Sequence, residues 1–419
     1  MKSKFSIFIL LCVLLIFLLV ACGGNIPVTT SVTEPTFTQL AEDIQPTATI
    51  IPTTTVIATS TPDSFIAACK AEPAAFTNVG LGLPRPTYKL PSIGTVKTIV
   101  LFADFEDAPA SQTPEEVFAL ISPDAENFYS DISYGNMAYI LEPHFVWLRL
   151  GQPSSHYGQG LRSYEGHLEF IQDAVNLADA DVDFSTAASV IVVVPPQASE
   201  VPFGPALGAN QGEGYTADGR TFENGVTSGA DLLGWGFLWL NHETGHIMSL
   251  PDLYAYNYDP SNYEDQHRFV GGFGLMGFIS GNAPEYFAFE RWQLGWLKDS
   301  QIICQQAADQ TTTLTAIETD GGTKAIIVPL NGTKLLVVES RRRIGYDQKL
   351  VKEGALVYTV DTSIYSGEGP IVVYPILEND PYRDQSPLAA GESFTVEGVT
   401  VTVIESTDEG DTVQVAITK

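Results

Sequence analysis

The fold of this chain turns on LLGWGFLWLNHETGHIMSLPDLY, the stretch that runs from Leu232 to Tyr254. An apolar run, whose aromatic side chains we expect in the core, leads into His242 and His246. On a helix, a spacing of four residues places two side chains on one face, one turn apart. Pro251 follows shortly, and a proline usually ends a helix just before it. We therefore predict a buried helix with two imidazoles directed at one point.

Two histidines at this spacing with a glutamate after the first are a zinc-site signature. His242 and His246 would each offer a ring nitrogen to one catalytic zinc ion. Glu243 would act as general base on a metal-activated water and then return the proton to the leaving amine. The pattern predicts hydrolytic chemistry at this helix.

Catalytic zinc keeps three protein ligands, so the motif needs one more. Asp252 stands six residues after His246, the offset of the short-spacer pattern in which the chain turns at the helix end and returns to the metal. Ser249 occupies the turn, where a positive φ favours glycine. Asp252 is the predicted third ligand, and Glu285 or Glu290 on a later helix remain as alternatives.

A second motif follows in the glycine-rich stretch 271–277, which surrounds Met276. A methionine there could simply fill a gap in the core. Its place after the histidine helix instead favours a Met-turn beneath the zinc site.

The N-terminal segment 1–21 is typical of a lipoprotein signal peptide. Lys2 and Lys4 precede an apolar run that ends in Leu-Val-Ala before Cys22, the predicted lipidation site. Residues 22–64 are rich in Thr, Pro and Ser without helical or strand periodicity, which predicts an extended stalk. We expect export and a lipid anchor on the extracellular face of the cell membrane.

Two cysteines remain for the exported part, Cys69 and Cys304. Outside the cell, a pair of thiols favours a disulfide. Two unpaired buried thiols are the alternative, because sequence spacing does not decide the pairing.

The rest of the chain divides into two parts by its pattern of predicted helices and strands. Residues 65–299 mix buried strands such as 95–104 and 188–194 with the helix 165–178, which predicts an α+β catalytic domain. Residues 300–419 carry β-branched runs separated by turn signals and predict an all-β sandwich or jelly-roll-like domain. The runs are 311–317, 324–330, 334–339, 355–360, 371–376, 394–406 and 412–419.

The composition restricts the partners. The chain has 419 residues and a hydrophobic share of 44%, enough for at least two cores. Fifty acidic against twenty-one basic residues give a net charge of −29, which disfavours nucleic acid. The carboxylates could also supply oxygen ligands to calcium. We expect a protein or peptide substrate and a membrane contact through the lipid anchor.

Several of these stretches together resemble the immune-inhibitor-A-type secreted metallopeptidases of bacteria. They are His242–Tyr254, the Leu-Met-Gly around Met276, and Trp292-Gln-Leu-Gly-Trp-Leu297. Ala103-Asp-Phe-Glu-Asp and the stretch Tyr129–Asn136 also match, so the resemblance covers roughly residues 95–300. Ser249 departs from the glycine that is common in this family.

The resemblance implies a zincin catalytic domain and zinc-dependent peptide hydrolysis, with calcium as a further ion. It carries the ligand role to His242, His246 and Asp252, the base role to Glu243 and the Met-turn role to Met276. The region after Trp296 is similar to the β domain of that family. No tyrosine that stabilises the transition state is identified.

These observations predict an exported, lipid-anchored zinc endopeptidase. The alternative is a surface-tethered binding or adhesion lipoprotein in which the zinc site is structural or a relic. Glu243 argues against that alternative, because a structural zinc site needs no base.

Overall fold

The computed structural model describes residues 63–74 and 78–418. The predicted signal peptide, Cys22 and the stalk up to residue 62 lie outside the described residues. The described part starts with α1 (Asp63–Ile66) and the short 3-10 helix η1 (Ala67–Cys69). None of the helices in this part is long and apolar enough to cross a membrane.

A five-stranded mixed sheet lies in the first half, with the order β2-β1-β3-β7-β4. Its first four strands run parallel, and β4 pairs antiparallel with β7 at the edge. The strands are β1 (Gly94–Asp104), β2 (Met137–Arg149), β3 (Ser189–Val193), β4 (Ala206–Gly208) and β7 (Asn224–Thr227). The sheet thus ends in an antiparallel strand, and no strand among the described residues pairs with its outer edge.

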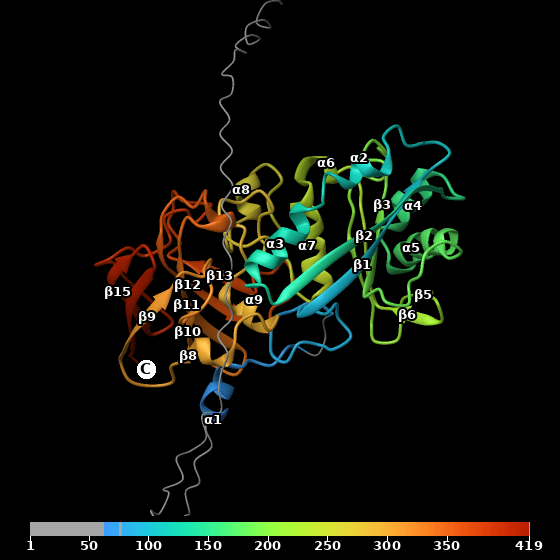
Figure 1. Ribbon diagram of the computed structural model, residues 1–419. Coiled ribbons are helices and arrows are strands. Elements are labelled where there is room, and N and C mark those ends of the chain that lie inside the picture. The colour runs from blue at the N-terminus through green and yellow to red at the C-terminus, as the bar shows by residue number, and fades with distance from the viewer. Residues whose placement is uncertain (1–62, 75–77, 419) are drawn as a thin grey trace, which may run out of the picture. The chain divides into compact units, whose positions relative to one another are not determined.

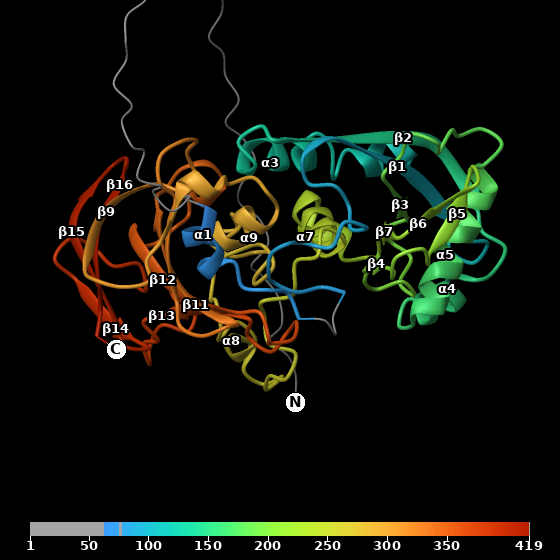
Figure 2. The ribbon, with the colours of Figure 1, turned by 90° about the horizontal axis from the view of Figure 1, so that it is seen from below.

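Both faces of this sheet are buried, which explains why β1 reads as a continuous apolar run rather than an alternating one. Val100 and Phe102 of β1 face one core cluster, whereas Ile99 and Leu101 face another. Helices α4 (Ser154–Gly160) and α5 (Tyr164–Ala178) lie on one side of the sheet and α7 (Phe237–Ile247) on the other (Figures 1 and 2).

Short elements complete this half. Helix α2 begins after the capping box of Thr113 and Glu116, which satisfies N–H groups at its first turn. The remaining elements are α2 (Pro114–Phe118), α3 (Asp124–Ile132), β5 (Tyr215–Ala217), β6 (Arg220–Phe222), α6 (Leu232–Trp235), α8 (Tyr263–Gln266), α9 (Ala288–Gln293) and η2 (Asp299–Gln301).

The second half holds two further sheets, with the orders β13-β12-β11-β10-β8 and β14-β15-β16-β9. Valines and leucines from both sheets form one shared core cluster. The elements are β8 (Ile302–Cys304), β9 (Gln310–Thr315), β10 (Ala325–Pro329), β11 (Lys334–Arg341), η3 (Gly345–Asp347), β12 (Gly354–Asp361), β13 (Ile371–Tyr374), β14 (Ser393–Val396), β15 (Val399–Thr407) and β16 (Gly410–Ile417). The described chain is therefore a mixed α/β protein with several sheets.

One strand prediction was wrong. The run 394–406 was expected as a single strand, but it forms the hairpin of β14 and β15. Glu397 and Gly398 lie between these strands with φ values of 54° and 75°. Two central residues with positive φ suit a tight hairpin turn, and Glu-Gly is a weaker turn signal than Asn-Gly.

The two halves are joined through a common core, because the largest cluster includes residues of α7, α9, β11 and β12. Helix α9 lies between α7 and the strands of the second half (Figure 2). Cys69 and Cys304 form a disulfide with a Cα–Cα distance of 5.8 Å, which ties η1 to β8.

Candidate metal centre

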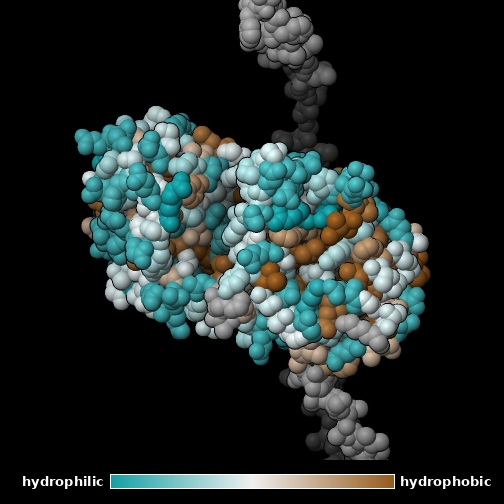
Figure 3. All heavy atoms as spheres, turned by 180° about the vertical axis from the view of Figure 1, so that it is seen from behind, coloured by the Kyte–Doolittle hydropathy of each residue, from teal (hydrophilic) through white to brown (hydrophobic). Residues whose placement is uncertain are grey.

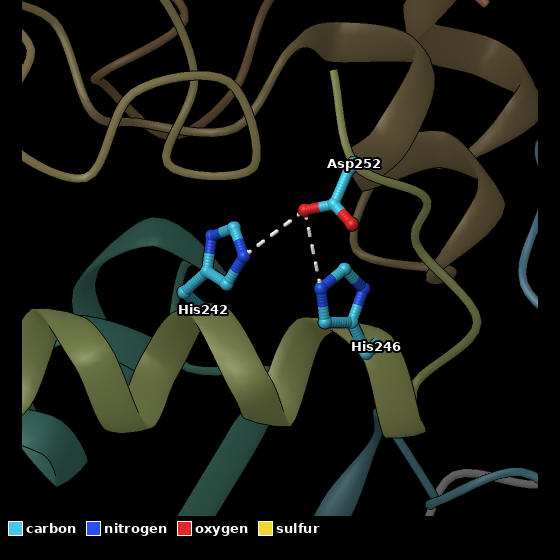
Figure 4. A group of neighbouring side chains, drawn as sticks. All are labelled: His242, His246 and Asp252. Atoms are coloured by element: carbon cyan, nitrogen blue, oxygen red, sulfur yellow. Dashed lines mark ion pairs between the residues drawn. The ribbon is translucent and has the colours of Figure 1, made fainter. Parts of the chain in front are cut away.

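Helix α7 holds His242 in a buried position and His246 in a partly buried one. Trp239 and Leu240 on the preceding turn are fully buried, and Trp239 Nε1 donates to the Gly204 carbonyl at 2.8 Å. These contacts fix the rotation of the helix about its axis. His242 and His246 consequently leave one face of α7 toward the same point (Figure 4).

The turn after α7 brings the chain back over the histidines. Leu250 N–H donates to the Gly245 carbonyl and Ser249 N–H to the His246 carbonyl, which is the Schellman pattern of a helix C-terminus. Ser249 occupies the position with positive φ, at 85°. The chain then continues through Pro251 to Asp252, whose carboxylate points at the two imidazoles (Figure 4).

The three side chains form the one group of at least three His, Cys, Asp or Glu side chains, within the described residues, that is close enough to hold a metal ion. Asp252 Oδ1 lies 3.2 Å from His242 Nε2 and 3.3 Å from His246 Nε2. Two ligands about 2.0 Å from one zinc ion at a tetrahedral angle are about 3.3 Å apart. These two distances fit zinc, and the three ligand atoms all lie within 4.8 Å of one another.

The hydrogen bonds behind the histidines select the nitrogens that face Asp252. His242 Nδ1 lies 2.9 Å from the Leu275 carbonyl, and His246 Nδ1 lies 2.8 Å from the Leu250 carbonyl. A carbonyl only accepts, so each Nδ1 carries the hydrogen and each Nε2 is left for the metal. Asp252 Oδ1 is buried and has no hydrogen-bond partner among the residues that the structure describes, as expected of an atom that faces a cation rather than a donor.

The charges at this group attract a cation. Burial raises the pKa of Asp252, but the imidazoles of His246 and His242 outweigh burial and hold that pKa well below its usual range. Burial lowers the pKa of His246, and Asp252 more than offsets this, raising it to about 9. The same negative potential attracts a proton and a metal ion, so a bound metal ion would displace protons from these side chains.

Glu243 lines the same pocket as the two histidines and contacts the edge of the first sheet. Its Oε2 accepts a hydrogen bond of 2.7 Å from the backbone N–H of Ala206 in β4. Burial raises the pKa of Glu243, which makes the carboxylate a stronger base. The N–H fixes one oxygen and leaves Oε1 for a substrate or water.

Met276 lies directly beneath α7. A Cβ on Gly245 would be 2.5 Å from Met276 Sδ, so helix and turn are in close contact. The carbonyl of the preceding residue, Leu275, accepts from His242, and Leu253 N–H donates to the Met276 carbonyl. The turn thus supports both ends of the ligand group.

A pocket of about 770 Å³ opens above these residues. His242, Glu243, His246 and Asp252 line it together with aromatic side chains; these are Phe203, Trp235, Trp239, Tyr254, Tyr256, Tyr263 and Phe278. Figure 3 shows one face of the molecule, on which hydrophilic residues cover most of the surface and hydrophobic ones form smaller patches. The expectation that all aromatics before the motif belong to the core was wrong for Trp235, which is 41% exposed.

The alternative third ligands lie elsewhere. Glu285 Oε2 pairs with Arg291 at 2.6 Å, and Glu290 Oε2 accepts from the N–H of Phe287 at 2.8 Å. Both carboxylates are used within the core around α9. The structure brings Asp252, and neither of these, to the histidines.

Two polar neighbours of the site were not predicted from the sequence. Tyr256 and Ser366 contact Asp252, and Ser366 comes from the second half of the chain. A tyrosine four residues after an expected ligand could have been noticed. Nothing in the sequence singles out one serine 114 residues away.

Comparisons with known proteins give little support. No family model matches the chain, and no curated protein matches it. Among solved structures, the crystal structure of metalloproteinase-II from Bacteroides fragilis is similar with a TM-score of 0.29 and 15% identity. The match covers 56% of this chain and 61% of that one, which is less than two thirds of the solved structure.

Proposed function

We propose that this chain is a zinc-dependent endopeptidase of the immune-inhibitor-A type. The observation that carries the proposal is the meeting of His242, His246 and Asp252 at zinc-ligand spacing in one pocket with Glu243. In this proposal residues 65–299 form a zincin-like catalytic domain, and residues 300–419 form a β-sandwich domain packed against it.

The roles follow from the contacts. A bound zinc ion supplies a Lewis acid that polarises a peptide carbonyl and eases the ionisation of water. Glu243 takes a proton from the attacking water through Oε1 and passes it to the leaving nitrogen. The N–H of Ala206 keeps the carboxylate in this orientation throughout. Met276 holds α7 from below.

An extended peptide can pair with the outer edge of strand β4. The Pro205 carbonyl accepts a hydrogen bond from the Thr227 N–H of β7. The Ala209 N–H donates to the carbonyl of Glu223, the residue before β7. In an antiparallel pair the groups of alternate residues face away from the partner, so those of Ala206 and Gly208 face outward. The Ala206 N–H is bonded to Glu243, which leaves the Ala206 carbonyl and the N–H and carbonyl of Gly208 for a peptide. A substrate backbone can add to such an edge. Both residues line the pocket, which places the peptide beside Glu243.

The test is cleavage of a generic unfolded protein by the full chain, purified in detergent, with and without a zinc chelator. Glu243→Gln carrying stoichiometric zinc is compared with Glu115→Gln, an exposed glutamate of α2. We expect chelator-sensitive cleavage that falls by about 10²–10⁴ in Glu243→Gln and stays unchanged in the control. Zinc binding without cleavage would instead favour the binding or adhesion lipoprotein.

We also propose that the chain is exported and anchored through a lipid on Cys22. The support is the sequence of the N-terminal segment, which ends in Leu-Val-Ala-Cys22. We expect the wild-type chain in the membrane fraction and Cys22→Ala outside it. Equal membrane recovery of both would argue against the lipid anchor.

A further inference from the structure

We propose that Tyr256 and Ser366 are positioning residues for the third metal ligand, so that a loop of the second half completes the metal centre. The loop comprises residues 362–370, between β12 and β13. This inference rests on the metal-binding part of the proposed function and adds residues that the zinc motif does not contain.

The loop is fastened to the ligand segment by main-chain hydrogen bonds. Gly367 N–H donates to the carbonyl of Asp252 at 3.0 Å, and Tyr256 N–H donates to the carbonyl of Gly367 at 3.0 Å. Both bonds bracket the ligand, one on its own carbonyl and one four residues later. The backbone of Asp252 therefore cannot shift without moving the loop.

Side chains extend this connection to the carboxylate itself. Tyr256 Oη donates to Asp252 Oδ2 at 2.5 Å. Asp252 N–H donates to Ser366 Oγ at 2.8 Å. Because the phenol hydrogen is used on the carboxylate, the 3.0 Å contact between the two hydroxyls takes its hydrogen from Ser366.

The result is a closed ring of donors around one end of Asp252. The ring occupies Oδ2 and leaves Oδ1 directed at His242 and His246. A carboxylate held in this way loses little rotational freedom when it binds a metal ion, and its charge is stabilised by a donor. The arrangement is the carboxylate counterpart of the carbonyls behind the two histidines.

Close packing shows that the loop is fitted to this tyrosine. A Cβ on Gly367 would be 2.2 Å from the Tyr256 ring, so only glycine lets the ring lie against the backbone. Gly367 also has a φ of 75°. The ring is thereby held over the loop although Tyr256 as a whole is 56% exposed.

The experiment measures zinc affinity of the full chain by competition with a chromophoric chelator, and records the visible spectrum of the cobalt-substituted protein. The variants are Ser366→Ala, Tyr256→Phe, the conservative Ser366→Thr, and Ser363→Ala as matched control. Ser363 lies in the same loop, and its Oγ contacts Asp361 and not the ligand. Thermal unfolding of the metal-free proteins shows whether each variant folds.

We expect zinc affinity to fall about tenfold to a hundredfold in Ser366→Ala and in Tyr256→Phe. The cobalt spectrum should change in both, whereas Ser366→Thr and Ser363→Ala should resemble the wild-type chain. The double variant should lose less than the product of the single losses, because both act on one carboxylate.

Wild-type affinity and an unchanged cobalt spectrum in both single variants would overturn the inference while leaving the proposed function intact. A wild-type chain that binds no zinc would overturn both. Tight zinc binding with altered variants but no peptide cleavage would support this inference and contradict only the peptidase.

Discussion

Gly245 and Met276 lie so close that a Cβ on the glycine would meet the methionine Sδ at 2.5 Å and the Tyr286 hydroxyl at 2.9 Å. Both neighbours are fully buried, and the Tyr286 hydroxyl donates to the Asn241 carbonyl at 3.1 Å. Neither can move aside without disturbing other contacts. The turn beneath the helix thus requires a glycine at position 245, directly before His246.

Gly245→Ala should therefore destabilise the chain. Alanine in a helix interior gains about 1 kcal/mol over glycine, but overpacking a core costs about 1–3 kcal/mol, and the second effect should win. Urea unfolding of the metal-free protein measures the difference. Gly234→Ala is the control, because a Cβ at that position of α6 meets nothing within 4 Å. A Gly245→Ala variant at least as stable as Gly234→Ala would refute the close contact.

Ser249 offers a test of backbone strain at the helix end. Its φ of 85° disfavours any side chain, and its Oγ lies 3.2 Å from Gln293 Nε2. Ser249→Gly and Ser249→Ala both lose this hydrogen bond, but only glycine removes the strain. We expect the glycine variant to be more stable than the alanine variant by about 1 kcal/mol in urea unfolding. The opposite order would show that the turn is not strained.

His167 should make stability depend on pH. Burial lowers its pKa to about 3, and its Nε2 lies 3.0 Å from Thr227 Oγ1. Between an unfolded pKa of about 6.5 and this folded value, only the unfolded chain takes up the proton. Stability is thus fully present above pH 6.5 and falls by up to about 1.4 kcal/mol for each unit of pH below it.

The measurement is the free energy of unfolding at several pH values between 7 and 4.5 for the wild-type chain and His167→Gln. Other groups titrate in both proteins, so the difference between the two slopes reports His167 alone. Parallel curves for wild type and His167→Gln would contradict the prediction.

The disulfide should contribute strongly to stability, because it closes a loop between residues 235 positions apart. Chain-entropy arguments give about 2–5 kcal/mol for long loops. The variant with both Cys69→Ser and Cys304→Ser should unfold at a lower temperature than the oxidised wild-type chain. A reductant should lower the midpoint of the wild-type chain and leave that of the variant unchanged. Equal midpoints without reductant would show that the bond adds nothing.

The parts of the site that could be predicted are those whose contacts join residues close together in the sequence. The helix of His242 and His246 could be read directly, because the 3.6-residue period is a property of the local backbone. That the chain turns and brings Asp252 back to the histidines could be proposed for the same reason. Asp252 stands only six residues after His246, and a proline lies between them. The strands of the first sheet could be recognised from continuous apolar runs.

Other features were decided only by the tertiary structure. The sequence left Glu285 and Glu290 open as third ligands, and the structure buries both around α9, where they contact Arg291 and the Phe287 N–H. The contact between Glu243 and Ala206 depends on the path of the chain to the sheet edge.

The sequence by itself determined the proposed chemistry, because two candidate ligands and a candidate base on neighbouring helix turns require only residue types at a fixed short spacing. The tertiary structure alone determined what orients that chemistry: the carbonyls behind the histidines, the edge strand beside Glu243, and Ser366 against Asp252. These contacts join residues that are far apart along the chain. Local propensities say nothing about them, because their geometry exists only after the sheets and helices have packed together.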